Sequence, residues 1–197
     1  LYQGSTGAYS HLAALEVYPD AEIIPCKTFD DCFIKAQKDE SLKIIIPESN
    51  RTTGNIGIEY LIFKYRLNIY AEHFHKIEHN LLGIPGSKIA NIKNVLSHSQ
   101  ALSQCSNYIK KNNLIESVRA DTAGSAEFIS KNKKISEAAI ASKLSAKIYK
   151  LNVIASNIEN EKGNTTRFLI MGKSISQPER DDKKYITSFL FKLKSKP

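Results

Sequence analysis

Cysteine is scarce in this chain, with three among 197 residues, and tryptophan is absent. Cys26, Cys32 and Cys105 are odd in number and widely spaced, and none of them forms a C-x-x-C pair. The sequence therefore indicates neither a disulfide framework nor a zinc site. We expect all three to be ordinary buried thiols.

Long apolar runs are also absent. No stretch approaches the roughly 18 consecutive apolar residues that a membrane-spanning helix needs. The first residues lack the basic and apolar segments of a secretory signal. The sequence therefore predicts a cytoplasmic protein with no membrane association. An apolar content of 42% over this length allows one large domain or two small lobes.

Negative charge is in deficit, because 28 Lys and Arg residues outnumber 20 Asp and Glu residues and leave a formal charge of +8. The lysines are dispersed among isoleucines and asparagines, with no basic-aromatic module of the kind that binds nucleic acid. A compositional lysine bias is the plainer interpretation, and no nucleic-acid partner is predicted. The excess charge would still attract a small anion.

Short apolar runs alternate with helix-length segments along the chain, which is typical of an α/β protein with mostly parallel sheets. The predicted strands are residues 22–24, 43–46, 67–70, 94–96, 138–141 and 152–155. The predicted helices are residues 9–18, 29–38, 56–64, 100–111, 123–132 and 143–150. Several of these helices begin just after a Ser, Thr or Asn, residues that cap free backbone N–H groups.

A polar motif stands at the start of one apolar run. Residues 163–168 (Gly-Asn-Thr-Thr-Arg-Phe) lead directly into residues 169–171 (Leu-Ile-Met). Two hydroxyls and a permanently charged guanidinium are thereby placed at the mouth of a predicted buried strand, where fixed donors can act on an anionic ligand. The plainer interpretation is a strand start of ordinary β-propensity beside a surface charge.

Three further stretches accompany this motif: residues 2–10 (YQGSTGAYS), 97–105 (SHSQALSQC) and 121–126 (DTAGSA). Shorter matches lie at residues 79–82, 138–142 and 157–160. In this order and at these spacings they resemble the catalytic domain of prephenate dehydratase, which converts prephenate to phenylpyruvate on the way to phenylalanine. The resemblance extends from the first residue to about residue 172.

The resemblance implies an α/β fold with two lobes, similar to a type II periplasmic binding protein, with the ligand in the cleft between them. On this interpretation residues 1–75 and 160–173 form the first lobe and residues 76–159 form the second. The chain would cross to the second lobe near residues 72–79 and return between about residues 157 and 165. Thr166 would then lie on the hinge side of the cleft.

The character of the chain changes after residue 172. Residues 174–184 are polar and are predicted to be a linker. Residues 185–197 are rich in strand-forming residues and resemble the first strand of the phenylalanine-sensing ACT domain that usually follows this catalytic domain. We therefore expect either a fragment or a protein that has lost its regulatory domain, and no feedback through a standard ACT site.

The resemblance also implies the chemistry. Prephenate carries two carboxylates, and its ring becomes aromatic when the ring carboxyl leaves as CO2 and the ring hydroxyl leaves as water. Aromatisation supplies the driving force, so no cofactor or metal is expected. Thr166 corresponds to the family's catalytic threonine, and we expect it to assist departure of the hydroxyl as a positioned hydrogen-bond donor. The alternative is a strand threonine that only satisfies nearby backbone groups.

Two neighbours of Thr166 are expected at the substrate. Arg167 is predicted either to clamp a substrate carboxylate with two hydrogen bonds or to form a salt bridge between the lobes. Phe168 is predicted to contact the substrate as part of the cleft wall or to lie in the core. Neither residue is expected to react.

Five other polar side chains match cleft positions of the family: Asn50, Ser97, Gln104, Asp121 and Thr122. Ser97 lies where a strand passes into a helix, whose free N–H groups would favour an anion. Each has a plainer alternative, since Ser97, Asp121 and Thr122 are also ordinary helix caps and Gln104 an ordinary solvated helix residue. His98 is expected to be structural.

A glycine-rich segment at the beginning of the chain has two interpretations. Gly4, Gly7 and Ser10 could form an anion-binding turn of the first lobe, or the two glycines could simply permit a tight bend between a strand and a helix.

One stretch departs from the family pattern. The family has Pro-x-Glu-Asn followed by Ser or Thr, whereas this chain has Ser49 in place of the glutamate and Arg51 in place of the hydroxyl. The two changes remove a carboxylate and add a guanidinium, so any proton-handling role of that carboxylate is expected to be lost. Glu48 is adjacent; on a regular strand it would face the opposite way, whereas in a loop it could still reach.

The sequence as a whole predicts a prephenate dehydratase-like lyase whose substrate is a small molecule. The nearest alternative is arogenate dehydratase, which carries out the same chemistry on a substrate with an amino group in place of the keto group. Another is a binding protein that keeps the cleft and has lost turnover, which the changes at Ser49 and Arg51 favour and the intact Thr166 motif opposes. A homodimer is plausible from the resemblance.

Overall fold

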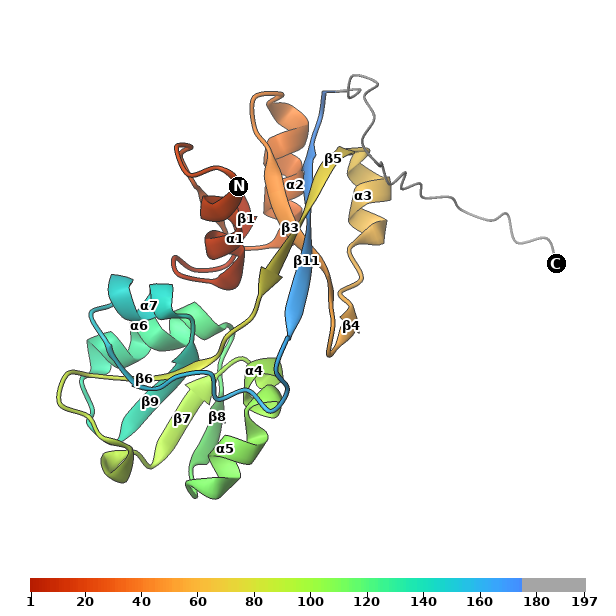
Figure 1. The fold of residues 1–197 in the computed structure, drawn as a ribbon. Helices are drawn as coiled ribbons and strands as arrows, with labels where there is room; N and C mark the ends of the chain where they lie inside the picture. Colours follow the sequence, from red (N-terminus) through yellow and green to blue (C-terminus); the bar gives the residue numbers. More distant parts are fainter. Residues whose placement is uncertain (175–197) are drawn as a thin grey trace.

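The computed structural model describes residues 1–174, which form two α/β lobes, each built around its own β-sheet (Figure 1). The two-lobed α/β class predicted from the sequence is thereby confirmed. The predicted terminal strand (residues 185–197) and all but the first residue of the predicted linker (174–184) lie outside the described residues. None of the helices in the described part of the chain combines the length and apolar character needed to cross a bilayer.

The first lobe is a mixed sheet in the order β2-β1-β3-β11-β5, with β4 paired to β3. Its strands are β1 (Tyr2–Gln3), β2 (Pro25–Cys26), β3 (Ile44–Asn50), β4 (Gly54–Asn55), β5 (Asn68–Lys76) and β11 (Thr165–Gly172). Its helices are α1 (Tyr9–Val17), α2 (Phe29–Lys38) and α3 (Glu59–Tyr65). Strand β11 comes from the far end of the described chain and pairs antiparallel with both β3 and β5.

The two faces of this sheet are covered by different helices. Along β11, Phe168 and Ile170 pack with Ala13 of α1, whereas Leu169 and Met171 pack with residues of α2 and α3. This alternation follows from the two-residue period of a strand. Both faces are therefore buried, and polar side chains can reach the cleft only near the strand ends.

The second lobe is a sheet in the order β10-β6-β9-β7-β8. Its strands are β6 (Asn80–Gly83), β7 (Asn94–Ser97), β8 (Ile115–Val118), β9 (Glu137–Ala141) and β10 (Asn152–Ala155). Its helices are the 3-10 turn η1 (Ile89–Asn91), α4 (Ser99–Gln104), α5 (Ser106–Lys111), α6 (Thr122–Asn132) and α7 (Lys143–Ile148). Two separate apolar clusters fill it, one under α4 and α5 and one under α6 and α7.

Local sequence explains where several helices begin. Before α2, the Thr28 hydroxyl accepts a hydrogen bond from the Asp31 backbone N–H and the Asp31 carboxylate accepts one from the Thr28 N–H, each at 3.1 Å. This reciprocal pair satisfies two backbone donors that a helix end leaves free. Asp121 caps α6 and Ser142 caps α7, each with a single hydrogen bond that its side chain accepts from a backbone N–H of the helix.

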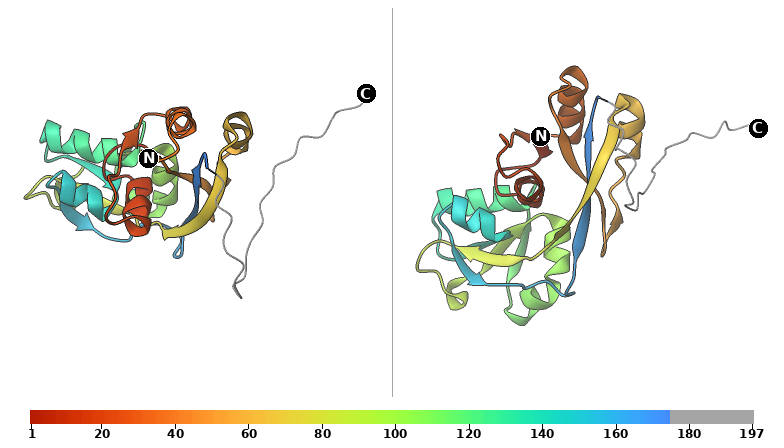
Figure 2. Two further views of the ribbon diagram at one scale, coloured as in Figure 1. Left: turned by 90° about the horizontal axis from the view of Figure 1, so that it is seen from above. Right: turned by 45° about the horizontal axis from the view of Figure 1, so that its top comes forward.

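Two segments connect the lobes and run side by side. The chain leaves the first lobe after β5 and returns through the segment before β11 (Figures 1 and 2). The Ile77 N–H donates to the Asn164 carbonyl at 2.8 Å, and the Ile158 N–H donates to the His79 carbonyl at 3.0 Å. These backbone bonds join the outgoing and returning segments into one hinge.

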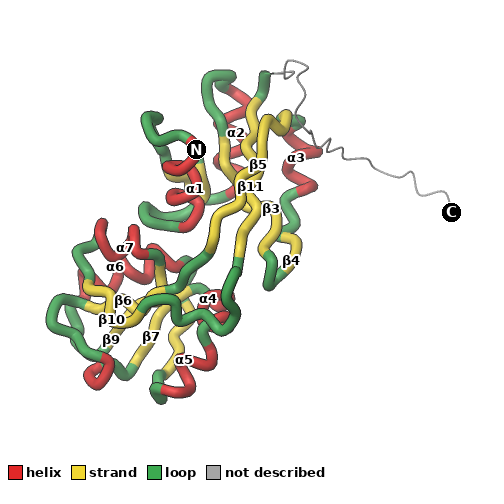
Figure 3. The backbone as a smooth tube through the Cα atoms, in the orientation of Figure 1, coloured by secondary structure: helices red, strands yellow, loops and turns green. Residues whose placement is uncertain are grey.

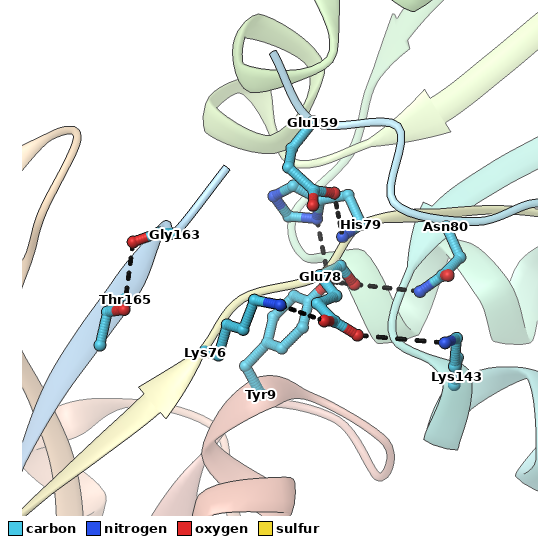
Figure 4. Close-up of polar contacts among 9 residues, drawn as sticks. All are labelled: Tyr9, Lys76, Glu78, His79, Asn80, Lys143, Glu159, Gly163 and Thr165. Atoms are coloured by element: carbon cyan, nitrogen blue, oxygen red, sulfur yellow. Dashed lines mark hydrogen bonds and ion pairs between the residues drawn. The ribbon is translucent and has the colours of Figure 1, made fainter. Parts of the chain in front are cut away.

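Side chains fix the outgoing hinge segment further (Figure 4). The Glu78 carboxylate lies 2.7 Å from the ammonium of Lys76, on the first lobe, and 4.0 Å from that of Lys143, on the second. The Glu159 carboxylate accepts a hydrogen bond from the His79 backbone N–H at 2.9 Å. Charged groups from both lobes therefore hold the segment in place. Figure 3 shows that the two segments connecting the lobes, after β5 and before β11, are loops.

Several details differ from the sequence prediction. The sheets are mixed rather than mostly parallel, because β11 and β6 both run antiparallel to their neighbours. Residues 22–24, predicted as a strand, form none, and pairing begins instead at β2. The predicted helix over residues 100–111 is two short helices that meet at Cys105. Strands β1, β4, β6 and β8 were not predicted.

Candidate active site

A cavity of about 380 Å³ lies between the two lobes. Both lobes contribute to its wall, and the hinge supplies Ile77 and His79. The lining residues are Gln3, Gly4, Ala8, Tyr9, Ser10, Phe29, Pro47, Asn50, Ile56, Ile77, His79, His98, Gln100, Ala101, Gln104, Ala120, Asp121, Thr122, Thr166 and Phe168. The predicted residues Asn50, Gln104, Asp121, Thr122, Thr166 and Phe168 are thus brought together at one cavity.

Thr166 and Asn50 form the polar centre of the first-lobe wall. They are direct partners in the register of β11 and β3, and the Asn50 amide donates to the Thr166 hydroxyl oxygen at 2.9 Å. The same amide group donates to the Asn164 side-chain carbonyl at 2.8 Å. Both Asn50 amide protons are therefore committed.

The orientation of the Asn50 side chain is fixed by its other end. Its carbonyl oxygen accepts hydrogen bonds from the Thr52 backbone N–H at 3.0 Å and from the Thr52 hydroxyl at 2.7 Å. A backbone N–H can only donate, so the oxygen must face Thr52 and the nitrogen must face Thr166. Thr166 then accepts from Asn50, and its own proton is directed elsewhere. Within residues 1–174 that proton has no protein acceptor, and Thr166 lines the cavity.

Gln104 connects this pair to the second lobe. Its amide donates to the Thr52 hydroxyl at 2.7 Å, and its carbonyl oxygen lies 2.8 Å from His79 Nε2. On the far side of the ring, His79 Nδ1 lies 2.9 Å from the Tyr9 hydroxyl. An unbroken hydrogen-bonded chain therefore runs from Tyr9 through His79, Gln104, Thr52 and Asn50 to Thr166, crossing between the lobes.

The protonation of this chain follows from its partners. Because the Gln104 carbonyl only accepts, His79 carries its proton on Nε2, and Nδ1 faces the Tyr9 hydroxyl, whose single proton is shared between Nδ1 and the Glu78 carbonyl, each at 2.9 Å. Burial lowers the pKa of His79, against smaller opposing contributions from Gln104 and Glu159, so the ring is neutral at pH 7. Burial also raises the pKa of Tyr9 well above its usual range. From His79 onward every donor then points toward Thr166, whose own hydroxyl lines the cavity.

Asp121 and Thr122 lie on the opposite wall, at the start of α6. One Asp121 carboxylate oxygen accepts from the Gly124 N–H at 2.5 Å, which is the capping role considered from the sequence. The other accepts from the Ser5 hydroxyl of the first lobe at 3.1 Å. Asp121 therefore both caps its helix and joins the lobes, while it faces the cavity.

Two predicted site residues lie outside the cavity lining. The Ser97 side chain is fully buried, and its hydroxyl donates to the Ile140 carbonyl at 2.7 Å, so it joins β7 to β9. The helix cap at this position is His98, whose ring accepts from the Gln100 N–H. Ser97 therefore fits neither the substrate contact nor the helix cap considered from the sequence.

Arg167 also lies outside the cavity lining. Its Nε donates to Glu72 at 2.7 Å and its Nη1 donates to Glu48 at 3.2 Å. Both carboxylates belong to strands of the first-lobe sheet, so the contact is a salt bridge within one lobe and not between lobes. Thr166 and Arg167 are consecutive on β11 and so face opposite sides of the sheet. Phe168 returns to the cavity side, where it is buried in the wall.

The departure at Ser49 acquires a different meaning in the structure. Strand β3 contains a bulge, with Ser49 opposite Arg167 and Pro47 opposite Phe168, so Glu48 is the extra residue. The Ser49 hydroxyl donates to the Glu48 carboxylate at 2.6 Å, and that carboxylate also accepts from Arg167. A carboxylate therefore remains beside Arg167 despite the serine. The Arg51 side chain contacts the Gly163 carbonyl and is likewise absent from the cavity lining.

The loop of residues 5–7 joins the lobes on the side away from Gln104. The Gly7 carbonyl accepts from the hydroxyls of Ser142 at 2.6 Å and Ser145 at 2.9 Å. The Thr6 carbonyl accepts from the Tyr149 hydroxyl at 2.8 Å. Gly7 has φ of +95°, and an added Cβ would lie 2.7 Å from the Ser145 hydroxyl. The glycine is therefore required both by its backbone angle and by the close approach of α7.

The polar groups that line the cavity are mostly neutral. Among its lining residues there is no Lys or Arg, and Asp121 is the one carboxylate. Amides, hydroxyls and the imidazoles of His79 and His98 supply the polar groups. Gln3, Tyr9, His79 and Gln100 also line the cavity, although they were not predicted as site residues and stood only within stretches that match the family. Their contribution depends on tertiary contacts, for which single-sequence spacing carries no signal.

Comparison with known proteins decides the family. The family model described as prephenate dehydratase matches residues 1–176. The chain belongs to the prephenate dehydratase family. The cavity between the lobes, with Thr166 in its wall, is therefore the candidate active site of a prephenate dehydratase family member.

Known members and solved structures agree with this assignment. Arogenate dehydratase/prephenate dehydratase 1, chloroplastic, from Arabidopsis thaliana is 42% identical over 100% of this chain and 50% of its own length. Prephenate dehydratase from Arthrobacter aurescens, solved with L-Phe, is 26% identical with a TM-score of 0.83, covering 91% of this chain and 62% of that one. A structure described as GqqA, a novel type of quorum quenching acylase, is 33% identical with a TM-score of 0.82, covering 89% and 64%. The chain spans about half the length of the curated relatives it matches.

Proposed function

We propose that this chain catalyses the decarboxylating dehydration of prephenate to phenylpyruvate, as a lyase that acts without a cofactor. The observation that carries the proposal is the Thr166 hydroxyl, which lines the interlobe cavity, accepts a hydrogen bond from Asn50 and has a proton free to donate. Membership of the prephenate dehydratase family supports this reaction class.

The proposed step needs one donor at a leaving oxygen. The bond between the ring and its carboxylate breaks, CO2 leaves, and the electron pair completes the aromatic ring as the C–O bond breaks. The departing hydroxide takes a proton that comes ultimately from solvent and becomes water. Thr166 is a very weak acid, so it acts as a fixed hydrogen-bond donor to the departing oxygen as negative charge develops there. Loss of one such donor typically costs about 10²- to 10³-fold in rate.

The hydrogen-bonded chain behind Thr166 supports this role. From His79 onward, each side chain donates a hydrogen bond to the next. Aligned hydrogen bonds polarise one another, which makes the Thr166 hydroxyl at the end a better donor. This series of hydrogen bonds crosses from Tyr9 and His79 to Gln104 and back to Asn50, so it is complete only when the lobes are in contact. Closure of the lobes would therefore position the donor and exclude water together.

A second candidate is the same reaction on arogenate, whose side chain carries an ammonium in place of the keto group. Asp121 favours it, because it is the single carboxylate among the lining residues and an ammonium could pair with it. Relatives named as arogenate dehydratases support it as well. The product would then be phenylalanine rather than phenylpyruvate.

Turnover of both substrates by the purified chain tests the proposal. We expect product release that is lost in Thr166→Val, which removes the hydroxyl while keeping the shape, and largely retained in Thr166→Ser. Subtraction of the Thr166→Val rate corrects for spontaneous aromatisation of prephenate. Equal rates in wild type and Thr166→Val would overturn the proposal, and substrate binding without product would indicate a binding protein that has lost turnover.

Asp121→Asn separates the two substrates. Asparagine caps a helix about as well as aspartate, so the start of α6 is retained while the charge is removed. If arogenate is the substrate, kcat/KM of the variant for arogenate should fall by about tenfold or more, which corresponds to the loss of one hydrogen bond to a charged group. Its kcat/KM for prephenate should stay the same. An equal effect on both substrates would argue against recognition of an ammonium by Asp121.

A further inference from the structure

A cluster of metal-binding side chains lies outside the cavity. Glu16 is in the last turn of α1, and His73 and His75 are on β5. A single Glu16 carboxylate oxygen lies 2.7 Å from His73 Nε2 and 2.9 Å from His75 Nδ1. The two histidines are two residues apart on a strand and so face the same side. This is the side on which α1 packs.

The donor set is one that a divalent transition metal prefers. One atom from each of the three side chains lies within 4.8 Å of the other two. Two imidazole nitrogens and a carboxylate oxygen, with a fourth position left to water, form a common zinc arrangement. Ions bound at about 2.1 Å in a tetrahedron hold their donors about 3.4 Å apart. The Glu16 oxygen therefore needs to withdraw from each ring by well under 1 Å to admit an ion.

The surroundings of the cluster hold the two histidines in place and leave a path by which an ion can enter. Strand β5 pairs with β11 along its length, so the histidine backbones are held by a continuous ladder of hydrogen bonds. The Glu16 side chain is 46% exposed and the His75 side chain 10%. One side of the cluster is therefore open to solvent, where an ion can enter and keep a water ligand, while the other side is fixed by the sheet.

We propose that Glu16, His73 and His75 bind a divalent transition-metal ion, with Zn²⁺ as the best fit. By the Irving–Williams order of metal affinities, Cu²⁺, Ni²⁺ and Co²⁺ can also bind such a set of nitrogen and oxygen donors. This site is separate from the cavity, and its existence does not depend on the proposed reaction.

The position of the site gives the ion a structural consequence. His75 stands opposite Thr166 in the strand register, and its ring centroid is 6.2 Å from that of Tyr9, at the start of α1. A bound ion would join α1 to β5 beside Thr166, on the same face of the sheet. We expect it to restrict the movement of Tyr9 and the hinge relative to the sheet.

Titration of the metal-stripped chain, prepared without a histidine tag, tests the proposal. Isothermal titration with ZnCl2 should give one site per chain, and Co²⁺ should give the visible absorption of a site with fewer than six ligands. His73→Ala and Glu16→Gln should each weaken Zn²⁺ binding at least tenfold. His98→Ala, which removes a histidine of the cavity wall outside the cluster, should bind Zn²⁺ as wild type does.

A second measurement guards against misfolded variants. Zn²⁺ should raise the melting temperature of wild type and of His98→Ala but not that of Glu16→Gln, each compared with its own metal-free melt. Glu16→Gln keeps the size of the side chain and can still bond both rings, so its metal-free fold should persist. Undetectable Zn²⁺ binding to wild type, or equal binding by wild type and both ligand variants, would overturn the proposal.

Discussion

At the scale of single residues, the chemistry of this protein depends on which face of a strand each side chain occupies. Thr166 and Arg167 are neighbours in sequence, yet one lines the cavity and the other lies between Glu48 and Glu72. Burial opposes the charge of Arg167, but its bonds to Glu72 and Glu48 outweigh that and raise the pKa of the guanidinium. Its role is to neutralise two adjacent carboxylates.

Arg167→Met tests this separation of roles. We expect the free energy of unfolding to fall by about 1–3 kcal/mol, because two partly buried carboxylates lose their shared cation. Since the side chain is not at the cavity, KM for the substrate should change less than twofold. Chemical denaturation and steady-state kinetics check the two parts. A large rise in KM with unchanged stability would instead support the carboxylate clamp predicted from the sequence.

Ser49→Glu tests the departure from the family pattern. The new carboxylate would join Glu48 and Glu72 around the single guanidinium of Arg167, outside the cavity. We expect lower stability and no gain in kcat. The neutral Ser49→Gln, of similar size, should cost less stability than Ser49→Glu in the same melting experiment. A clear gain in kcat for Ser49→Glu alone would show that Glu48 does not replace the missing carboxylate.

At the scale of elements, the short loop of residues 5–7 acts as a second connection between the lobes, independent of the hinge. Its carbonyls accept hydroxyl protons from α7 and from Tyr149, and its Ser5 bonds to Asp121. Hydroxyl-to-carbonyl bonds of this kind are individually modest, at about 1 kcal/mol each. Several together can hold the lobes closed while allowing them to open for substrate.

Gly7→Ala should weaken this connection. The substitution meets both a positive φ and a Cβ contact of 2.7 Å with Ser145, and we expect it to cost about 2–4 kcal/mol and to lower kcat/KM. Gly54→Ala is the matched control, because Gly54 has φ of +80° but nothing within 4 Å of its added Cβ. It should cost only about 1 kcal/mol of backbone strain. Equal losses in thermal melts would show that contact with α7 is unimportant.

At the scale of the whole molecule, buried histidines make stability depend on pH. Burial lowers the pKa of both His11 and His79, so between the folded pKa and about 6.5 the unfolded chain binds more protons than the folded one. Stability contributed by neutral imidazoles is therefore fully present above pH 6.5 and is lost as pH falls through the folded pKa. The hinge, where His79 lies, should open first.

Melting temperatures at pH 7.5 and 5.5 check this linkage. We expect wild type to melt lower at pH 5.5, and His79→Gln to show a smaller difference between the two pH values because it removes one of the two histidines whose pKa is lowered by burial. The expectation fails if His79→Gln and wild type lose the same number of degrees.

Sequence alone indicated the family, and the resemblance to that family implied the two-lobed α/β class and six of the residues that line the cavity. Local signals by themselves gave the α/β class, from apolar runs of strand length, and the helix starts, from capping residues such as Asp121. The period of a strand also allowed Arg167 to be placed opposite Thr166, an inference that the resemblance to a family obscured. The predicted helix over residues 100–111 is broken at Cys105 in the structure. Nothing in the sequence indicated this break, because both halves have helical character.

Tertiary structure alone decided which groups act together. The bulge that places the Glu48 carboxylate beside Ser49 and Arg167 depends on pairing between β3 and β11, strands separated by more than a hundred residues. The contact of Gln104 with Thr52 and His79 depends on how the lobes close. His73 and His75 share a face by their spacing, but only the packing of α1 brings Glu16 to them. Each of these is set by long-range contacts, whereas sequence patterns report only on neighbours along the chain.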